Sequence, residues 1–300
     1  MAPRSSLAAH CMKHDELARE IAATAFPDVR ITSVLARTGK SVLLCGKTMT
    51  RRVVVKVLTS DDPVWRQRFA SEISFYRNAG VESPPVCVPQ LLGVSGDGTA
   101  MLLEHVSGDP LSASRHRSHR VAGRRLDLCL ESLSALACWR PSWLGSADEN
   151  FSDKLVMKAE DQAARGALTS ADVAAMVKLI GRVGSKRQLA HGDMIPTNCL
   201  FHGNRVFLVD WEHAGLHLPT CDHALLWVVL HHRRDRQAIA ASAQAARGPR
   251  AAAFAVNRLL LIAREIRIHQ EASELASAAS VLRSLGQGLA SLRVEIRKLL

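Results

Sequence analysis

The stretch that decides the fold is Leu189-Ala-His-Gly-Asp-Met-Ile-Pro-Thr-Asn-Cys-Leu-Phe201, followed by Val206-Phe-Leu-Val-Asp-Trp-Glu212. Both pieces contain short apolar runs of the kind that form β-strands. Between and beside these runs lie two carboxylates, Asp193 and Asp210, and one amide, Asn198. Phosphoryl transfer needs such a set, because one acid orients a hydroxyl and accepts its proton while the amide and the second acid hold Mg²⁺ on the nucleotide phosphates.

These residues also have a purely structural reading. A carboxylate can simply end a strand, and His191-Gly-Asp193 can be a polar turn between helix and sheet. The full set in this order resembles the aminoglycoside phosphotransferase/choline kinase-like group, small-molecule relatives of the protein kinases. The resemblance implies an α+β, two-lobed protein-kinase-like fold. Its small antiparallel-sheet N-terminal lobe would span residues 1–107, and its larger, mainly helical C-terminal lobe residues 108–300.

A lysine and a glutamate upstream fit the same resemblance. Lys56 is embedded in the β-branched run 53–58, so its side chain lies at an edge or points into a cleft. It is similar to the family's strand lysine, which reaches the α- and β-phosphates. Glu72 follows on a predicted helix over residues 66–77, and an inward-facing Glu72 would pair with Lys56. The alternative is a solvent-exposed glutamate on an amphipathic helix.

Two Gly-Lys pairs in the N-terminal region invite comparison with a P-loop. Neither fits, because Val34 and Ser41 occupy the positions where that motif has its first glycine. The loop 37–41 instead lies where the resemblance places a hairpin that covers the nucleotide. The resemblance also places a hinge after residues 99–104, with adenine bound by backbone groups near Leu103 and His105.

The charge of the chain bears on its partners. Thirty-nine Lys and Arg against 28 Asp and Glu give a formal charge of +11, which suits ATP, an acidic substrate, nucleic acid or a membrane surface. The basic run 115–125 has no aromatic residue to stack on bases, so we expect a solvated loop or an anion-tolerant surface there and no nucleic-acid partner. Residues 215–300 contain twelve Lys and Arg and six Asp and Glu. Because aminoglycosides are polycations, this balance predicts a neutral or anionic acceptor.

Composition sets the cellular context. No uninterrupted apolar segment resembles a secretory signal or a membrane span, so we expect a cytoplasmic protein with no membrane partner. The seven cysteines form no C-x-x-C pair, which predicts neither a zinc site nor a disulfide framework. We expect them to be small core residues in a reducing compartment.

The sequence therefore predicts an ATP- and Mg²⁺-dependent phosphotransferase acting on a hydroxyl of a small molecule, an antibiotic or similar natural product. The expected residues are catalytic Asp193, nucleotide-binding Lys56, Glu72, Leu103 and His105, and Mg²⁺ ligands Asn198 and Asp210. Three alternatives remain: a catalytically silent nucleotide-binding protein of this fold, a kinase of a primary metabolite, and a basic nucleic-acid-associated module. Glu212 either supports the metal indirectly or is exposed. The helix predicted over residues 170–180, which leads into the catalytic stretch, is expected to be capped by Ser170.

Overall fold

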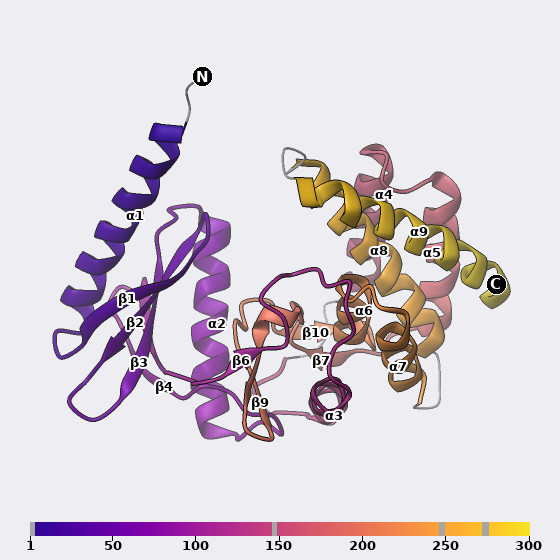
Figure 1. The fold of residues 1–300 in the computed structure, drawn as a ribbon. Coiled ribbons are helices and arrows are strands. Elements are labelled where there is room, and N and C mark those ends of the chain that lie inside the picture. Colours follow the sequence, from indigo (N-terminus) through magenta and orange to yellow (C-terminus); the bar gives the residue numbers. More distant parts are fainter. Residues whose placement is uncertain (1–3, 146–148, 246–249, 272–275) are drawn as a thin grey trace. The chain divides into compact units, whose positions relative to one another are not determined.

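The computed structural model describes residues 4–145, 149–245, 250–271 and 276–300. The chain forms two compact units (Figure 1). The first contains Met1–Gly108 and Phe207–Ala214, and the second contains Asp109–Val206 and Gly215–Leu300. The segment 207–214, which the sequence analysis assigned to the C-terminal lobe, thus clusters with the first unit. None of the described helices is long and apolar enough to cross a membrane.

The first unit is built on a five-stranded antiparallel sheet with strand order β1-β2-β3-β5-β4. Its strands are β1 (Arg30–Arg37), β2 (Ser41–Lys47), β3 (Arg52–Leu58), β4 (Leu91–Val94) and β5 (Ala100–Glu104). Its two helices are α1 (Arg4–Ala25) and α2 (Pro63–Val81). The side chain of Asp62 caps α2, and Pro63 occupies the first turn, where its missing N–H costs nothing.

The central strand β3 presents different chemistry on its two faces. Side chains alternate along a strand, so Val53, Val55 and Val57 share one face and Lys56 points to the other. The three valines pack in one core cluster with Ala18 and Ala22 of α1. This apolar packing fixes β3 from one side and leaves the lysine directed toward α2.

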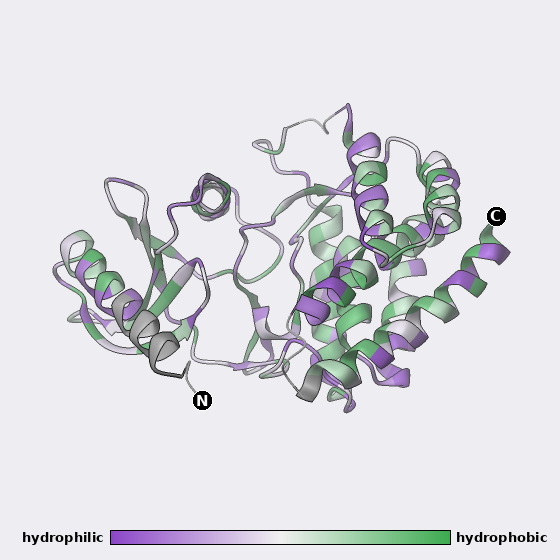
Figure 2. Cartoon of the chain, turned by 90° about the horizontal axis from the view of Figure 1, so that it is seen from above, coloured by the Kyte–Doolittle hydropathy of each residue, from purple (hydrophilic) through white to green (hydrophobic). Residues whose placement is uncertain are grey.

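The second unit is mainly helical (Figure 1). Its helices are α3 (Gly123–Cys138), α4 (Phe151–Ala164), α5 (Ser170–Val183), α6 (Cys221–Val229), α7 (Arg233–Gln244), α8 (Arg250–Glu271) and α9 (Ala276–Leu299). All nine residues of α6 are buried, as expected for a helix that is hydrophobic on every side. Figure 2 shows many apolar residues on the helices of this unit, and α8 buries most of the residues from Ala252 to Glu265.

Short strands complete this unit. β7 (Gln188–Ala190) pairs with β10 (Gly215–His217). β6 (Asp109–Pro110), β8 (Cys199–His202) and β9 (Arg205–Leu208) form a second small sheet, and Pro196–Asn198 form one turn of 3₁₀ helix.

The predicted α+β class, with a small antiparallel sheet and a mainly helical remainder, is confirmed. Two local predictions were wrong. Thr169, and not Ser170, caps α5, because its hydroxyl accepts the Asp172 amide while the Asp172 carboxylate accepts the Thr169 amide. Cys138 is exposed at the end of α3, unlike the buried Cys45, Cys129, Cys199 and Cys221; Cys11 lies outside the residues whose side chains are described.

Candidate active site

A buried ion cluster occupies the first unit on the lysine face of β3. Lys56 Nζ lies 2.6 Å from Glu72 Oε2 and 2.5 Å from Asp210 Oδ1. Glu72 comes from α2, and Asp210 follows β9 in the segment that clusters with this unit. Lys56 and Glu72 are almost fully buried, while one third of the Asp210 side chain is exposed. One ammonium group therefore contacts two carboxylates, one of them open to solvent.

Burial and charge act in opposite directions in this cluster. Burial alone would lower the pKa of Lys56, but Glu72 and Asp210 together outweigh it and raise that pKa, so the ammonium stays charged. Burial raises the pKa of Glu72 to about 7, although Lys56 counteracts it. The cluster thus combines a permanent cation with a carboxyl whose pKa is raised by burial.

A second ion pair extends this cluster. Lys40, from the β1–β2 turn, donates to the buried Glu212 and lies 4.4 Å from the Trp65 ring centroid. Burial acts to raise the pKa of Glu212, but hydrogen bonds from His213 and Lys40 lower it to about 2. Glu212 is therefore a buried, charged residue and not an exposed one.

The carboxylates of the first unit have the chemistry of a Mg²⁺ site. Glu72, Asp210 and Glu212 offer oxygens that all lie within 4.8 Å of one another. Glu72 Oε1 is buried and has no hydrogen-bond partner within the described part of the chain. Hard oxygen donors of this kind fit Mg²⁺, and Asp210 is the most accessible of the three.

The backbone at Asp210 has an unusual conformation. Its φ of 69° is left-handed, which few non-glycine residues adopt. The next residue holds this turn: the Trp211 indole donates to the Leu208 carbonyl at 2.9 Å and stacks on Phe75 with centroids 3.9 Å apart. Packing therefore enforces the conformation that aims the Asp210 carboxylate at Lys56.

The loop after β7 in the second unit is held by backbone hydrogen bonds. Asp222, in the first turn of α6, accepts the amides of His191 at 2.8 Å and Gly192 at 2.9 Å. Gly192 has a φ of 81°, a conformation that glycine adopts without strain. His191 is fully buried, and its Nδ1 atom lies 3.3 Å from the Asp193 amide. His191 and Asp222 therefore hold the loop that presents Asp193.

Asn198 closes this loop from its other end. Its Nδ2 donates to the Asp193 carbonyl at 2.9 Å, and the 3₁₀ turn begun by Pro196 brings it there. Within the described part of the chain, its Oδ1 atom has only a 3.5 Å contact with the Thr197 hydroxyl, so this oxygen is available to a cation. The second unit thus brings the predicted catalytic acid and one predicted metal ligand together.

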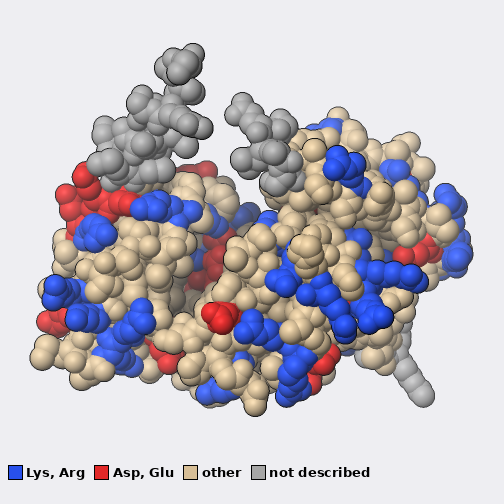
Figure 3. Space-filling model, in the orientation of Figure 1, with Lys and Arg blue, Asp and Glu red and all other residues tan. Residues whose placement is uncertain are grey.

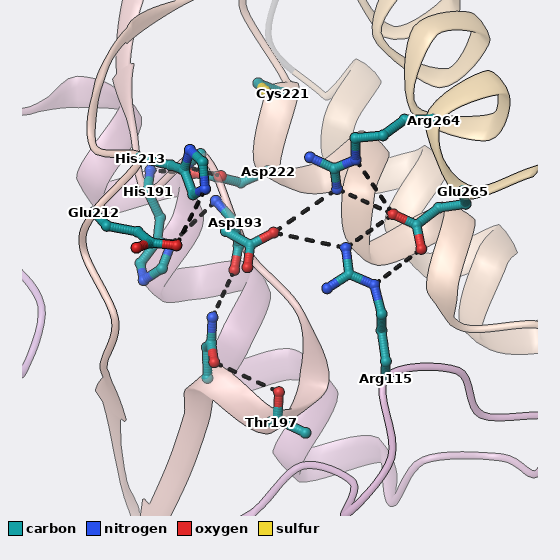
Figure 4. A network of polar contacts seen from close by, with 12 residues as sticks. Arg115, His191, Asp193, Thr197, Glu212, His213, Cys221, Asp222, Arg264 and Glu265 are labelled. Carbon is teal, nitrogen blue, oxygen red and sulfur yellow. Dashed lines mark hydrogen bonds and ion pairs between the residues drawn. The ribbon is translucent and has the colours of Figure 1, made fainter. Parts of the chain in front are cut away.

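Two arginines that were not predicted from the sequence contact the Asp193 carboxylate (Figure 4). Arg115 and Arg264 each place Nη2 near Asp193 Oδ1, at 3.8 and 3.7 Å. Both also bind Glu265, which is fully buried. Arg115 lies in the basic run predicted to be solvated, yet it is held by an ion pair.

The two residues proposed for adenine binding lie at the end of β5. Leu103 is buried and is flanked by Val54 of β3 and Leu91 of β4. The His105 amide donates to the Arg52 carbonyl at 3.4 Å. Their part in nucleotide binding stays a prediction.

Comparison with known proteins agrees with this geometry. The profile of the phosphotransferase enzyme family matches residues 38–255. No curated protein matches the chain. Among solved structures, the GDP complex of aminoglycoside 2′-phosphotransferase-IIIa has a TM-score of 0.67 at 16% identity, covering 91% of this chain and 97% of that one.

A thermostable mutant of aminoglycoside phosphotransferase APH(4)-Ia, in complex with ADP and hygromycin B, has a TM-score of 0.64 at 15% identity, covering 92% of this chain and 98% of that one. At such identities the likeness shows the fold. Because the family profile covers most of its length, the chain belongs to the phosphotransferase enzyme family, with the protein-kinase-like fold of these structures, and is a small-molecule kinase.

Proposed function

We propose that this kinase transfers the γ-phosphoryl group of ATP to a hydroxyl of a neutral or anionic small molecule, an antibiotic or similar natural product, in the cytoplasm. The observation that carries the proposal is the contact of Lys56 with both Glu72 and Asp210. A charged lysine held this way matches the phosphate-binding lysine of kinases. The solved structures with ADP and GDP support a purine nucleotide as the donor.

The mechanism assigns a separate task to each residue. Asp193 orients the acceptor hydroxyl and accepts its proton as the oxygen attacks the γ-phosphorus in line. Lys56, positioned by Glu72, binds the α- and β-phosphates. Asn198 and Asp210 would supply oxygen ligands to a Mg²⁺ ion, which would neutralise charge on the phosphates. Most of the rate acceleration then comes from positioning and electrostatics.

The charge of the second unit supports the proposed acceptor class. Among the charged side chains on the face of this unit seen in Figure 3, Lys and Arg prevail over Asp and Glu. The two carboxylates bonded around the Asp193 loop, Asp222 and Glu265, are buried and already bound to backbone amides and arginines. Neither is available to the ammonium groups of a polycation. Kanamycin and hygromycin B, which occur in related structures, are therefore the competing acceptors to test.

The test is acceptor-dependent ATP consumption by the full chain with Mg²⁺ across neutral, anionic and polycationic hydroxylated compounds. Asp193→Asn should retain nucleotide binding and lose phosphoryl transfer by roughly a thousandfold or more. Asp127→Asn, an exposed position on α3, is the matched control and should keep full activity. ATP binding without consumption over the whole panel would favour a silent nucleotide-binding protein, and a strong preference for kanamycin would overturn the acceptor class.

A further inference from the structure

Two arginines converge on the proposed catalytic carboxylate from distant parts of the second unit. Arg115 lies in the loop before α3, and Arg264 lies on α8. Figure 4 shows both guanidinium groups pointing toward Asp193, with Glu265 on their far side. Each Nη2 atom is within 3.8 Å of Asp193 Oδ1. The acceptor hydroxyl that Asp193 binds therefore has two cationic neighbours.

Glu265 holds both arginines in place. Arg115 binds it through two atoms, with Nε at 2.9 Å from Oε2 and Nη2 at 2.8 Å from Oε1. Arg264 Nη2 lies 3.1 Å from Oε1. Burial acts to raise the pKa of Glu265, but the hydrogen bonds from Arg115 and His116 and the charge of both arginines lower it. Glu265 therefore stays ionised. A fixed guanidinium loses little conformational entropy when it binds a ligand.

Two histidines, His116 and His231, support Glu265 through hydrogen bonds. His116 Nε2 lies 3.1 Å from Glu265 Oε2, and His116 Nδ1 lies 2.9 Å from His231 Nε2. His231 Nδ1 accepts hydrogen bonds from Arg236 and Ser284, so the proton of this ring is on Nε2. His231 Nε2 therefore donates to His116 Nδ1, and His116 Nε2 donates to Glu265. Burial lowers the pKa of His231 to about 3, so it is neutral at physiological pH. Glu265 therefore accepts the last hydrogen bond of a chain that runs from His231 through His116.

Both arginines keep donors for a ligand. Neither Nη1 atom has a partner among the residues that the structure describes, and each side chain is 30% exposed. Their Nε and Nη2 atoms face Glu265, which leaves the Nη1 side of each guanidinium for another acceptor of hydrogen bonds. Arginine edges of this kind bind carboxylates and phosphates in preference to neutral groups.

We propose that Arg115 and Arg264 bind a negatively charged group of the acceptor next to the hydroxyl that Asp193 orients. The inference rests on the proposed function and narrows its acceptor to hydroxylated acids. The acid group lies close to the phosphorylated hydroxyl, because both arginines place Nη2 within 3.8 Å of Asp193 Oδ1. A carboxylate and a phosphate monoester satisfy the same donors.

The test uses compounds that share one six-carbon polyol chain and differ in charge: gluconate, sorbitol 6-phosphate, neutral sorbitol and cationic glucamine. Binding to the full chain is measured by calorimetry with a non-hydrolysable ATP analogue and Mg²⁺, and turnover by ATP consumption. We expect at least one of the two anions to bind about tenfold or more tightly than sorbitol, and glucamine to bind most weakly. Comparing gluconate with sorbitol 6-phosphate identifies the preferred acid.

Arg115→Gln and Arg264→Gln should each reduce the preference for the anion over sorbitol about tenfold, while Arg264→Lys keeps part of it. Arg267→Gln, one turn along α8 and paired with Glu271, is the matched control and should change nothing. Equal binding of anion and sorbitol, a preference for glucamine, or an anion preference that survives both glutamine substitutions would overturn the inference. An equal loss of turnover with all acceptors in the glutamine variants would also overturn it, because the arginines would then act on the nucleotide and not on the acceptor.

These outcomes are separable from a failure of the proposed function. If anions bind selectively through the two arginines but no compound stimulates ATP consumption, phosphoryl transfer fails and the anion site stands. If Asp193→Asn abolishes transfer and no anion preference exists, the proposed phosphoryl transfer stands and the anion site fails.

Discussion

Lys56 Nζ lies 2.6 Å from Glu72 Oε2, joining the central strand β3 to helix α2. The lysine also binds Asp210, so one buried cation balances two carboxylates. Lys56→Met would leave both carboxylates without a cation partner. We expect it to lower the free energy of unfolding by about 3–5 kcal/mol, measured by urea denaturation, and to abolish turnover.

Lys47→Met provides the control for that change, because Lys47 is exposed at the end of the neighbouring strand β2. Its stability should stay within about 0.5 kcal/mol of the original protein. A Lys56→Met protein as stable as the Lys47 variant would show that the buried pair contributes nothing to the fold.

Asp222→Asn should damage both stability and catalysis. The carboxylate accepts two backbone amides of the loop that presents Asp193, and an asparagine side chain can accept only through its one oxygen. One buried amide then lacks a partner, which costs about 1–3 kcal/mol. Turnover should fall beyond the loss of folded protein, measured as kcat per folded molecule.

The matched control is Asp235→Asn. Asp235 is equally buried and accepts the Val121 amide at 2.9 Å, away from the Asp193 loop. It should lose stability and keep its kcat. Equal kcat losses in the two variants would remove the loop-positioning role of Asp222.

Gly192→Ala tests the backbone conformation before Asp193. An alanine at a φ of 81° is strained by about 1–2 kcal/mol, and relieving that strain would displace the Asp193 carboxylate. We expect kcat to fall roughly tenfold or more. Gly203→Ala introduces the same kind of strain at a φ of 59° in the β8–β9 turn, where a Cβ atom meets nothing within 4 Å. That variant should be destabilised but retain its kcat, and a matching drop there would contradict the argument.

The stability of the first unit should depend on pH through Glu212. Its folded pKa of about 2 is below the ordinary value of 4.5, so the unfolded chain binds more protons between these values. The contribution is fully present above about pH 4.5 and is lost as the pH falls toward 2. Glu212→Gln should therefore be less stable than the original protein at pH 7, with the gap closing below pH 4.5 in urea denaturation series.

Glu160→Gln removes an exposed carboxylate of α4 and serves as the comparison. The difference from the original protein should be small at every pH. A Glu212→Gln gap that stays constant from pH 7 to about pH 3 would show that its ion pair with Lys40 has no net effect.

The sequence was sufficient to locate candidate site residues that lie close to one another along the chain. Asp193 and Asn198 are five positions apart, so their spacing limits where both can go, and the spacing of Lys56 and Glu72 fits a strand followed by a helix. The family resemblance, and not the spacing alone, implied that Lys56 pairs with Glu72, and the structure has this pair. Asp210 was found by its place at the end of an apolar run, although nothing in the sequence indicates its left-handed φ.

The contacts that sequence missed join distant segments. Arg115 and Glu265 are 150 positions apart, and Lys40 and Glu212 are 172 apart. An arginine in a basic run is indistinguishable from its solvated neighbours until the chain brings a buried carboxylate to it. The cap of α5 was misplaced by one residue because Thr169 and Ser170 offer the same hydroxyl, and only the backbone decides which one lies outside the helix.

Because side chains alternate along β3, the residues on its two faces are constrained for different reasons. The valines serve the packing of the strand alone, whereas Lys56 serves the fold through its ion pairs and, on the proposed function, turnover as well. A saturation library of this seven-residue strand, sorted once for abundance and once for turnover, should give tolerance profiles that coincide at Val55 and Val57, while at Lys56 turnover should fall further than abundance.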